Sequence, residues 1–172
     1  MPSKKHYVIT ALTLGAIAAA SGLLIGATNL ITKGPIKDNE DKQINAGIAA
    51  VFGENSKATI YQDVDENAGY IDKVYSVQNG ESVNLGWAVF TSGRNDFGKI
   101  SMIVGFNDLK AFKGIYLTTN EQSYASTLVE EYVDPLNNGK VELDDVSCGA
   151  TFGATLVRNM VNSAQEYVNG IE

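Results

Sequence analysis

The sequence predicts an α+β protein in which a single N-terminal transmembrane helix precedes an antiparallel-sheet domain with flanking helices. Three observations favour this fold: a long uncharged segment near the N-terminus, a series of β-prone segments separated by short turns, and an amphipathic segment near the C-terminus. The chain has 172 residues, 44% of them apolar, which leaves room for one compact domain. We expect an N-terminal segment over residues 1–6, a membrane helix over 7–32 and a domain over 33–172.

The membrane helix is predicted from the absence of charge in residues 7–32. A helix of that length would extend roughly 39 Å, more than the hydrocarbon core of a bilayer. A cleaved signal peptide is the alternative, with Lys4 and Lys5 at its start and Ala18-Ala19-Ala20 as the cleavage site. Because the apolar run continues to Ile31, beyond the core of a signal peptide, we favour an uncleaved anchor.

The residues that flank the helix predict its orientation. Lys4 and Lys5 precede it, whereas the basic residues that follow it are mixed with acidic ones. The positive-inside rule therefore favours a single-pass protein of the cell membrane with a cytoplasmic N-terminus and an extracytoplasmic domain. Ala18, Gly22 and Gly26 recur every four residues, which either predicts a face for a second membrane helix or reflects the ordinary composition of bilayer helices.

Composition excludes several functions for the domain. When Lys4 and Lys5 are set aside, 11 of the 13 basic residues remain against 20 acidic residues, a net charge of −9. Such a domain repels nucleic acid, so no nucleic-acid partner is expected. A single Cys148 and a single His6 cannot build a disulfide, a His/Cys metal cluster or a histidine-based catalytic triad. We expect no metal site and no hydrolytic activity.

The domain is predicted to begin with a short helix over residues 41–52 and to continue as strands. Four strands rich in Val, Ile, Tyr and Phe are expected at Ile71–Val77, Val83–Thr91, Lys99–Asn107 and Phe112–Thr119. Turns are expected at Asn79-Gly80, Ser92-Gly93 and Asn107-Asp108. These short links indicate an antiparallel meander. A further helix is expected over residues 124–132, ended by Asp134-Pro135.

A turn of small and hydroxyl-bearing residues, 145–155, precedes the last helical pattern. The apolar positions of that helix are expected to be Leu156, Met160 and Ala164 on one stripe, with Val157, Val161, Val168 and Ile171 beside it. Free N–H groups and the helix dipole at such a terminus favour an anion, and Gly149 and Gly153 allow it to approach closely. The lysine of a Walker-type loop is missing. The alternative is a tight turn with a threonine as the helix N-cap.

Several segments together resemble one protein family. They are Thr28-Asn29-Leu30-Ile31-Thr32-Lys33, Gly86-Trp87-Ala88-Val89, Met102-Ile103-Val104-Gly105-Phe106-Asn107 and the turn 145–155. Nearly the whole chain resembles the G subunit of the Rnf ion-translocating ferredoxin:NAD oxidoreductase and, more distantly, the C subunit of the sodium-translocating NADH:quinone reductase. The resemblance implies an FMN-binding domain. In that family the last hydroxyl of the pattern Asp-x-x-Ser/Thr-Gly-Ala-Thr-x-Ser/Thr carries FMN through a phosphoester bond.

The match to this pattern is incomplete. Asp145 corresponds to its acidic residue and Gly149-Ala150-Thr151 to its core, but the first hydroxyl is replaced by Cys148. The acceptor position is Gly153, which has no side chain to esterify. Covalent FMN is therefore excluded there, and Thr151 and Thr155 are the nearby hydroxyls that remain as acceptors.

The resemblance and the turn together predict a set of FMN-binding residues. The turn would bind the phosphate, Glu121 lies in a loop where the family has Glu-Thr-Pro, and three aromatic residues are candidate neighbours of the flavin ring, although each type is also common in ordinary packing. The predicted residues are Gly149, Ala150, Thr151, Phe152, Gly153, Thr155, Trp87, Phe97, Glu121 and Tyr124.

Three functions follow as hypotheses. The first is a membrane-anchored FMN electron-transfer subunit of an ion-translocating Rnf-type complex, in which the flavin supplies the chemistry and no residue is catalytic. The second is a structural subunit of the same complex that has lost its flavin, as Gly153 suggests. The first two imply other membrane subunits as partners. The third is a membrane-tethered protein that binds a small anion.

Overall fold

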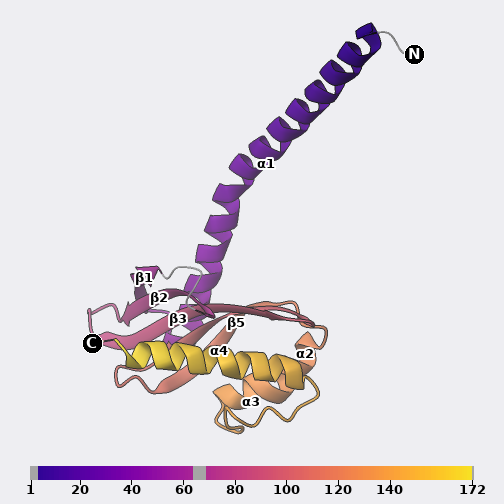
Figure 1. Cartoon of the computed structure of the whole chain (residues 1–172). Helices are drawn as coiled ribbons and strands as arrows, with labels where there is room; N and C mark the ends of the chain where they lie inside the picture. Colours follow the sequence, from indigo (N-terminus) through magenta and orange to yellow (C-terminus); the bar gives the residue numbers. More distant parts are fainter. Residues whose placement is uncertain (1–3, 64–68, 172) are drawn as a thin grey trace. The chain divides into compact units, whose positions relative to one another are not determined.

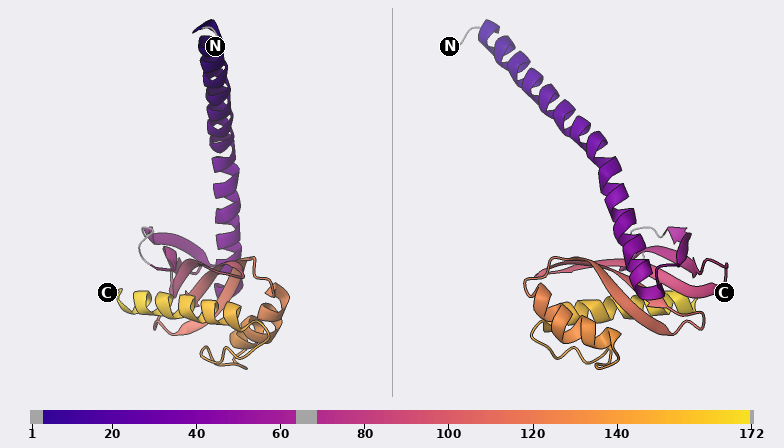
Figure 2. Two further views of the ribbon diagram at one scale, coloured as in Figure 1. Left: turned by 45° about the vertical axis from the view of Figure 1, so that its right-hand side comes forward. Right: turned by 180° about the vertical axis from the view of Figure 1, so that it is seen from behind.

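The computed structural model describes the backbone of residues 4–63 and 69–171, and the side chains of residues 7–28, 39–62 and 69–171. The chain divides into two units, Met1–Lys42 and Gln43–Glu172. The first is helical and the second contains the sheet (Figures 1 and 2). The predicted N-terminal segment 1–6 and the predicted end of the membrane helix at Thr32 lie outside the described side chains.

The first unit contains most of helix α1 (Lys4–Phe52). Within it, Tyr7–Thr28 is long and apolar enough to cross a membrane, by length and composition, and its side chains are exposed. The sequence predicted two helices with a break at residues 33–40, but the structure has one helix that ends at Phe52. Polar residues and one proline between two apolar segments do not by themselves end a helix.

The second unit is built on a five-stranded antiparallel sheet in the order β1-β2-β3-β4-β5. The strands are β1 (Lys57–Asp63), β2 (Ile71–Gln78), β3 (Asn84–Asn95), β4 (Gly98–Phe106) and β5 (Phe112–Asn120). The predicted meander is confirmed. Strand β1 was not predicted, because its apolar residues Ile60 and Tyr61 are adjacent rather than alternating, and both are exposed on this edge strand.

The hairpin of β3 and β4 differs from the prediction. The expected turn at Ser92-Gly93 is wrong, since these residues lie within β3 and pair with Ser101 and Ile100. The chain turns later, between Asn95 and Gly98. Gly93 has a packing role instead: a Cβ atom there would lie 3.0 Å from Cδ1 of Leu156 in α4 (Thr151–Asn169).

Helices cover both faces of the sheet. Figures 1 and 2 show α4 lying along one face, where its side chains pack against Val89, Met102 and Val104. On the opposite face, the last turns of α1 bury Ile44 and Ile48 against Tyr75, Phe90 and Ile103. In β4, Met102 and Val104 face α4, whereas Ile103 faces α1. The strand is therefore buried on both sides. All the apolar positions predicted for the last helix are buried: Leu156, Val157, Met160, Val161, Ala164, Val168 and Ile171.

Short helical turns connect β5 to the loop before α4. They are α2 (Ala125–Leu128), the π-helix η1 (Val129–Val133) and α3 (Asp134–Asn137). The predicted stop at Asp134-Pro135 is wrong because Pro135 lies in the first turn of α3, where its missing N–H needs no partner. The Asn137 side chain bonds both the N–H (2.8 Å) and the C=O (2.9 Å) of Ile115 in β5 and so holds these turns to the sheet.

Tyr132 anchors η1 in the core. Its side chain is fully buried, and its hydroxyl donates a hydrogen bond to the carbonyl oxygen of Leu143. Burial raises the pKa of Tyr132 to about 12; Arg158 opposes this shift and Asp144 adds to it. The neutral phenol is therefore the form that the folded chain retains.

We predict that Tyr132→Phe lowers the free energy of unfolding by about 1 kcal/mol near neutral pH, because it leaves the Leu143 carbonyl unpaired. Since the folded pKa of Tyr132 lies above the ordinary value, the wild type loses stability only as the pH rises above 10. This titration costs the wild type about 1.4 kcal/mol between pH 9 and pH 11, so its advantage over the variant should be gone by pH 11. Urea unfolding of both chains in detergent micelles measures this difference, and an advantage that stays constant up to pH 11 would contradict the prediction.

A second prediction concerns Gly86 in β3, which has φ +130° and whose Cβ atom, if present, would lie 2.0 Å from the Phe106 carbonyl oxygen. We expect Gly86→Ala to lower the free energy of unfolding by about 3 kcal/mol or more, because the backbone of two paired strands must separate. Gly80→Ala is the matched control, since no atom lies within 4 Å of its Cβ position. It should change the free energy by less than about 0.5 kcal/mol. Equal effects of the two substitutions in urea unfolding would refute this account.

Candidate functional site

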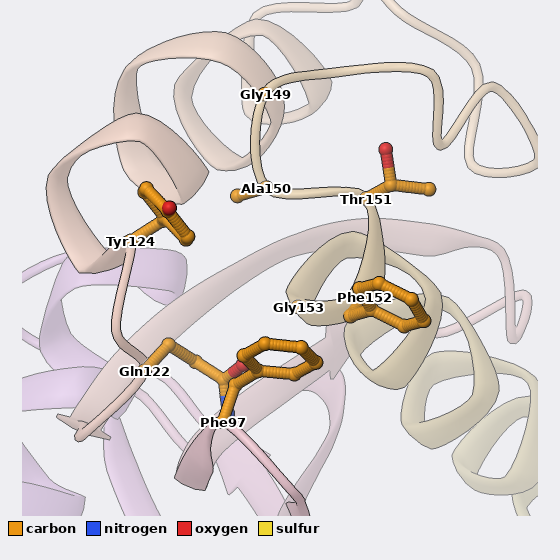
Figure 3. Close-up of a pocket in the computed structure, with 8 residues that line it drawn as sticks. All are labelled: Phe97, Gln122, Tyr124, Gly149, Ala150, Thr151, Phe152 and Gly153. Atoms are coloured by element: carbon orange, nitrogen blue, oxygen red, sulfur yellow. The ribbon is translucent and has the colours of Figure 1, made fainter.

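A pocket of about 340 Å³ opens where the tip of the β3–β4 hairpin, the loop after β5 and the N-terminus of α4 meet. Its volume is near the lower end of the range for small-molecule sites, ~300–1,000 Å³. Three segments that are far apart in the sequence provide its walls, as Figure 3 shows. The residues that line it are Phe97, Gln122, Tyr124, Gly149, Ala150, Thr151, Phe152 and Gly153.

Most of the residues predicted to bind FMN line this pocket, but three do not. Trp87 lies near the opposite end of β3, roughly 26 Å along the strand from Asn95, and its ring packs edge-on against Tyr61 with centroids 4.9 Å apart. Trp87, which we predicted to adjoin the flavin ring, therefore does not line this pocket. Glu121 is exposed and forms an ion pair with Arg94 at 3.4 Å. Thr155 is half-buried within α4, beyond the residues that line the pocket.

Exposed aromatic side chains surround the pocket. Phe97, at the hairpin tip, and Phe152, in the first turn of α4, stack with centroids 4.9 Å apart and an interplanar angle of 23°. Phe152 is 67% exposed and Tyr124 is 60% exposed. Apolar rings on the surface beside a hollow offer flat area that a planar ligand can cover. The close-up shows the Phe97 and Phe152 rings side by side (Figure 3).

Two amide side chains that were not predicted as site residues hold the pocket together. The Asn95 Oδ1 atom accepts from the Phe97 N–H (2.9 Å) and from Gln122 Nε2 (3.0 Å), while Asn95 Nδ2 donates to the Phe152 carbonyl oxygen (3.2 Å). Gln122 Nε2 also donates to the Gly98 carbonyl oxygen (2.7 Å). The hairpin tip, the loop after β5 and α4 are therefore joined by one network. The sequence offered one signal for these residues, because Asn95 and Gln122 each carry an amide side chain close in sequence to a predicted site residue, Phe97 or Glu121.

The Gln122 side chain presents an acceptor to the pocket. It is only 7% exposed, and both hydrogens of its Nε2 group are used within the network. The Oε1 atom lies 3.4 Å from the position that a Cβ atom of Gly153 would take. A buried amide oxygen in this place favours a ligand with a hydrogen-bond donor.

The helix after the turn begins earlier than its sequence indicated. The structure starts α4 at Thr151, with Ala150 at the N-cap and no side-chain cap, so Gly153 and Thr155 are helical. The alternative of a threonine N-cap is wrong, because the Thr151 hydroxyl donates backwards to the Cys148 carbonyl oxygen at 2.6 Å. Glycine is unfavourable inside a helix, but the packing at position 153 has a use for it. A Cβ atom there would lie 3.0 Å from Leu128 Cδ2, so a larger residue would crowd this contact between helices.

A carboxylate of the chain already lies at the N-terminus of α4. Glu131, from η1, accepts a hydrogen bond from the Gly149 N–H through Oε2 at 2.7 Å. This distance is typical of a charge-assisted hydrogen bond. The Gly149 N–H was predicted to bind a phosphate, so the internal carboxylate takes one of the donors expected for the ligand.

The two sides of the pocket therefore differ in their fit to FMN. The aromatic rings and Gln122 suit a flat ring system with a donor group, whereas the phosphate position is approached by Glu131. Gly153 offers no hydroxyl, and the exposed Thr151 hydroxyl is engaged with Cys148. Among the residues that the structure describes, no three His, Cys, Asp or Glu side chains come together to hold a metal ion.

One known protein family matches the N-terminal region of the chain. Residues 1–51 match the family model of the RnfG N-terminal region. From Lys4 onwards the matched residues lie in α1, and the match ends before the sheet, so it includes none of the pocket residues. No curated protein matches the chain. The match of residues 1–51 supports the assignment of this chain as an RnfG-type subunit of the Rnf complex.

Proposed function

We propose that this chain is a membrane-anchored electron-transfer subunit of an ion-translocating Rnf-type complex and binds FMN, without a covalent bond, at the pocket beside α4. The observation that carries the proposal is the convergence of exposed aromatic rings and one buried amide on a single pocket. The match of residues 1–51 supports the complex to which the subunit belongs.

The side chains of the pocket would bind and orient the flavin ring. Phe97, Phe152 and Tyr124 provide apolar area for its faces and edges, and Gln122 Oε1 provides an acceptor for a ring N–H. FMN would supply the electron transfer, which no side chain of this pocket performs. The net charge of −9 that follows the membrane segment would influence which partner approaches the ring.

The location follows from the same proposal. Tyr7–Thr28 would span the cell membrane once, and Lys4 and Lys5 would keep the N-terminus in the cytoplasm with the domain outside. Other membrane subunits of the complex would be the partners of the anchor.

A structural subunit without flavin is the second candidate. Gly153 at the usual acceptor position and Glu131 at the Gly149 N–H favour it, because both remove interactions that a phosphate would need. Glu131 also argues against the third hypothesis, a binding site for a small anion. The structural candidate differs from the first in one measurable property, the affinity of the purified chain for flavin.

We predict that the full chain in detergent micelles binds FMN and that Phe97→Ala and Phe152→Ala each weaken this binding about tenfold. The reason is the lost apolar contact, for which tenfold corresponds to about 1.4 kcal/mol. Quenching of flavin fluorescence on titration measures the affinity. Tyr61→Ala is the matched control, since Tyr61 is an exposed aromatic residue that packs on Trp87 away from the pocket. If the wild-type chain does not bind FMN, the structural candidate replaces this proposal.

We also predict that flavin is released when the chain is denatured, even after co-expression with a flavin transferase. No hydroxyl stands at the acceptor position, and Thr151 and Thr155 are displaced from it within α4. Intact mass and the fluorescence of the denatured chain measure attachment. A flavin signal that survives denaturation and disappears in a Thr151→Val, Thr155→Val double variant would show instead that a threonine is modified.

A further inference from the structure

We propose that Glu131 determines which ligands this pocket accepts, by excluding a phosphate group from the N-terminus of α4. The pocket should then bind an unphosphorylated flavin at least as well as FMN, because the ring provides the affinity and the phosphate adds nothing. This inference rests on the proposed function, since it concerns the same pocket.

The first support is the contact itself. Glu131 Oε2 lies 2.7 Å from the Gly149 nitrogen, and Gly149 lines the pocket. A carboxylate oxygen has the charge and the acceptor character that a phosphate oxygen would bring to the same N–H. One N–H cannot serve both groups at this distance, and two anions held together repel each other. A phosphate can therefore reach the Gly149 N–H only if Glu131 leaves it.

The second support is independent of the helix terminus. Gln122 is more than nine-tenths buried, and its Oε1 atom borders the pocket with both Nε2 hydrogens engaged elsewhere. This acceptor also disfavours a phosphate and favours a ligand that donates. Gln122 and Glu131 thus both favour a ligand without a phosphate group. The ligand class is a planar, uncharged ring system with an N–H donor.

The segment that carries Glu131 is firmly positioned. The next residue, Tyr132, is buried and bonded to the Leu143 carbonyl oxygen, and Leu128, one turn earlier, is buried against Gly153. The Glu131 side chain is exposed, as is that of Glu130 beside it. Substitution of either glutamate therefore leaves the core unchanged, and Glu130 is a suitable control because the contact with Gly149 belongs to Glu131.

The test compares FMN with riboflavin, which has the same ring and no phosphate, on the full chain in detergent micelles. Dissociation constants are measured by flavin fluorescence for the wild type, Glu131→Ala and Glu130→Ala. We expect similar constants for the two flavins in the wild type. In Glu131→Ala the affinity for FMN should rise about tenfold relative to that for riboflavin, and Glu130→Ala should resemble the wild type. An unchanged ratio in Glu131→Ala, or a wild type that prefers FMN about tenfold, would overturn the inference.

A second readout separates this inference from the proposed function. The Gly149 amide resonance is followed by NMR while inorganic phosphate is added to the same three chains. We expect phosphate to move this resonance in Glu131→Ala and to leave it in place in the wild type and in Glu130→Ala. If no chain binds flavin, the proposed function fails. A phosphate-dependent shift of the Gly149 resonance in Glu131→Ala alone would still support the exclusion of phosphate by Glu131. A resonance that moves equally in the wild type refutes the exclusion.

Discussion

The close packing of α4 against both the sheet and the turns that precede it is the constraint on which the rest of the domain depends. Gly93 in β3 and Gly153 in α4 permit this packing, since a Cβ atom at either position would lie 3.0 Å from a leucine methyl group. The helix buries its apolar stripe against the sheet and brings its first turn beside Leu128. A larger residue at position 153 would press on the contact that positions the pocket.

The network around Asn95 and Gln122 converts that packing into a defined pocket. Asn95 reaches the hairpin tip, the loop after β5 and the backbone of Phe152, so two loops and the first turn of α4 share one set of hydrogen bonds. Exposed loops with aromatic tips would otherwise be expected to move independently. The stacking of Phe97 on Phe152 follows from these bonds, because Asn95 bonds the backbone of both residues.

The fold was predicted better than the site, for a physical reason. The local order of apolar and polar residues indicates which positions are buried. This pattern predicted the buried stripe of Leu156, Met160 and Ala164 and the strands between Ile71 and Thr119. Whether Gly153 ends a turn or enters a helix depends on Leu128, a residue from another segment. The contact between Glu131 and Gly149 and the separation of Trp87 from the pocket likewise arise from tertiary structure. The resemblance to a family implied a phosphate at the turn, but residue spacing carries no information on which side chain reaches that turn.

Two features of this chain act on the same part of the proposed ligand. Gly153 removes the hydroxyl that would be esterified, and Glu131 takes one of the N–H groups that would stabilise the phosphate. A hydroxyl restored at position 153 would project from a Cβ atom that lies between Leu128 Cδ2 and Gln122 Oε1, and a phosphate joined to it would enter a site that already holds a carboxylate. The aromatic residues and Gln122, which we propose to bind the ring, have no such conflict. The proposed phosphate site and the proposed ring site are formed by different residues, so the loss of the first would not require the loss of the second.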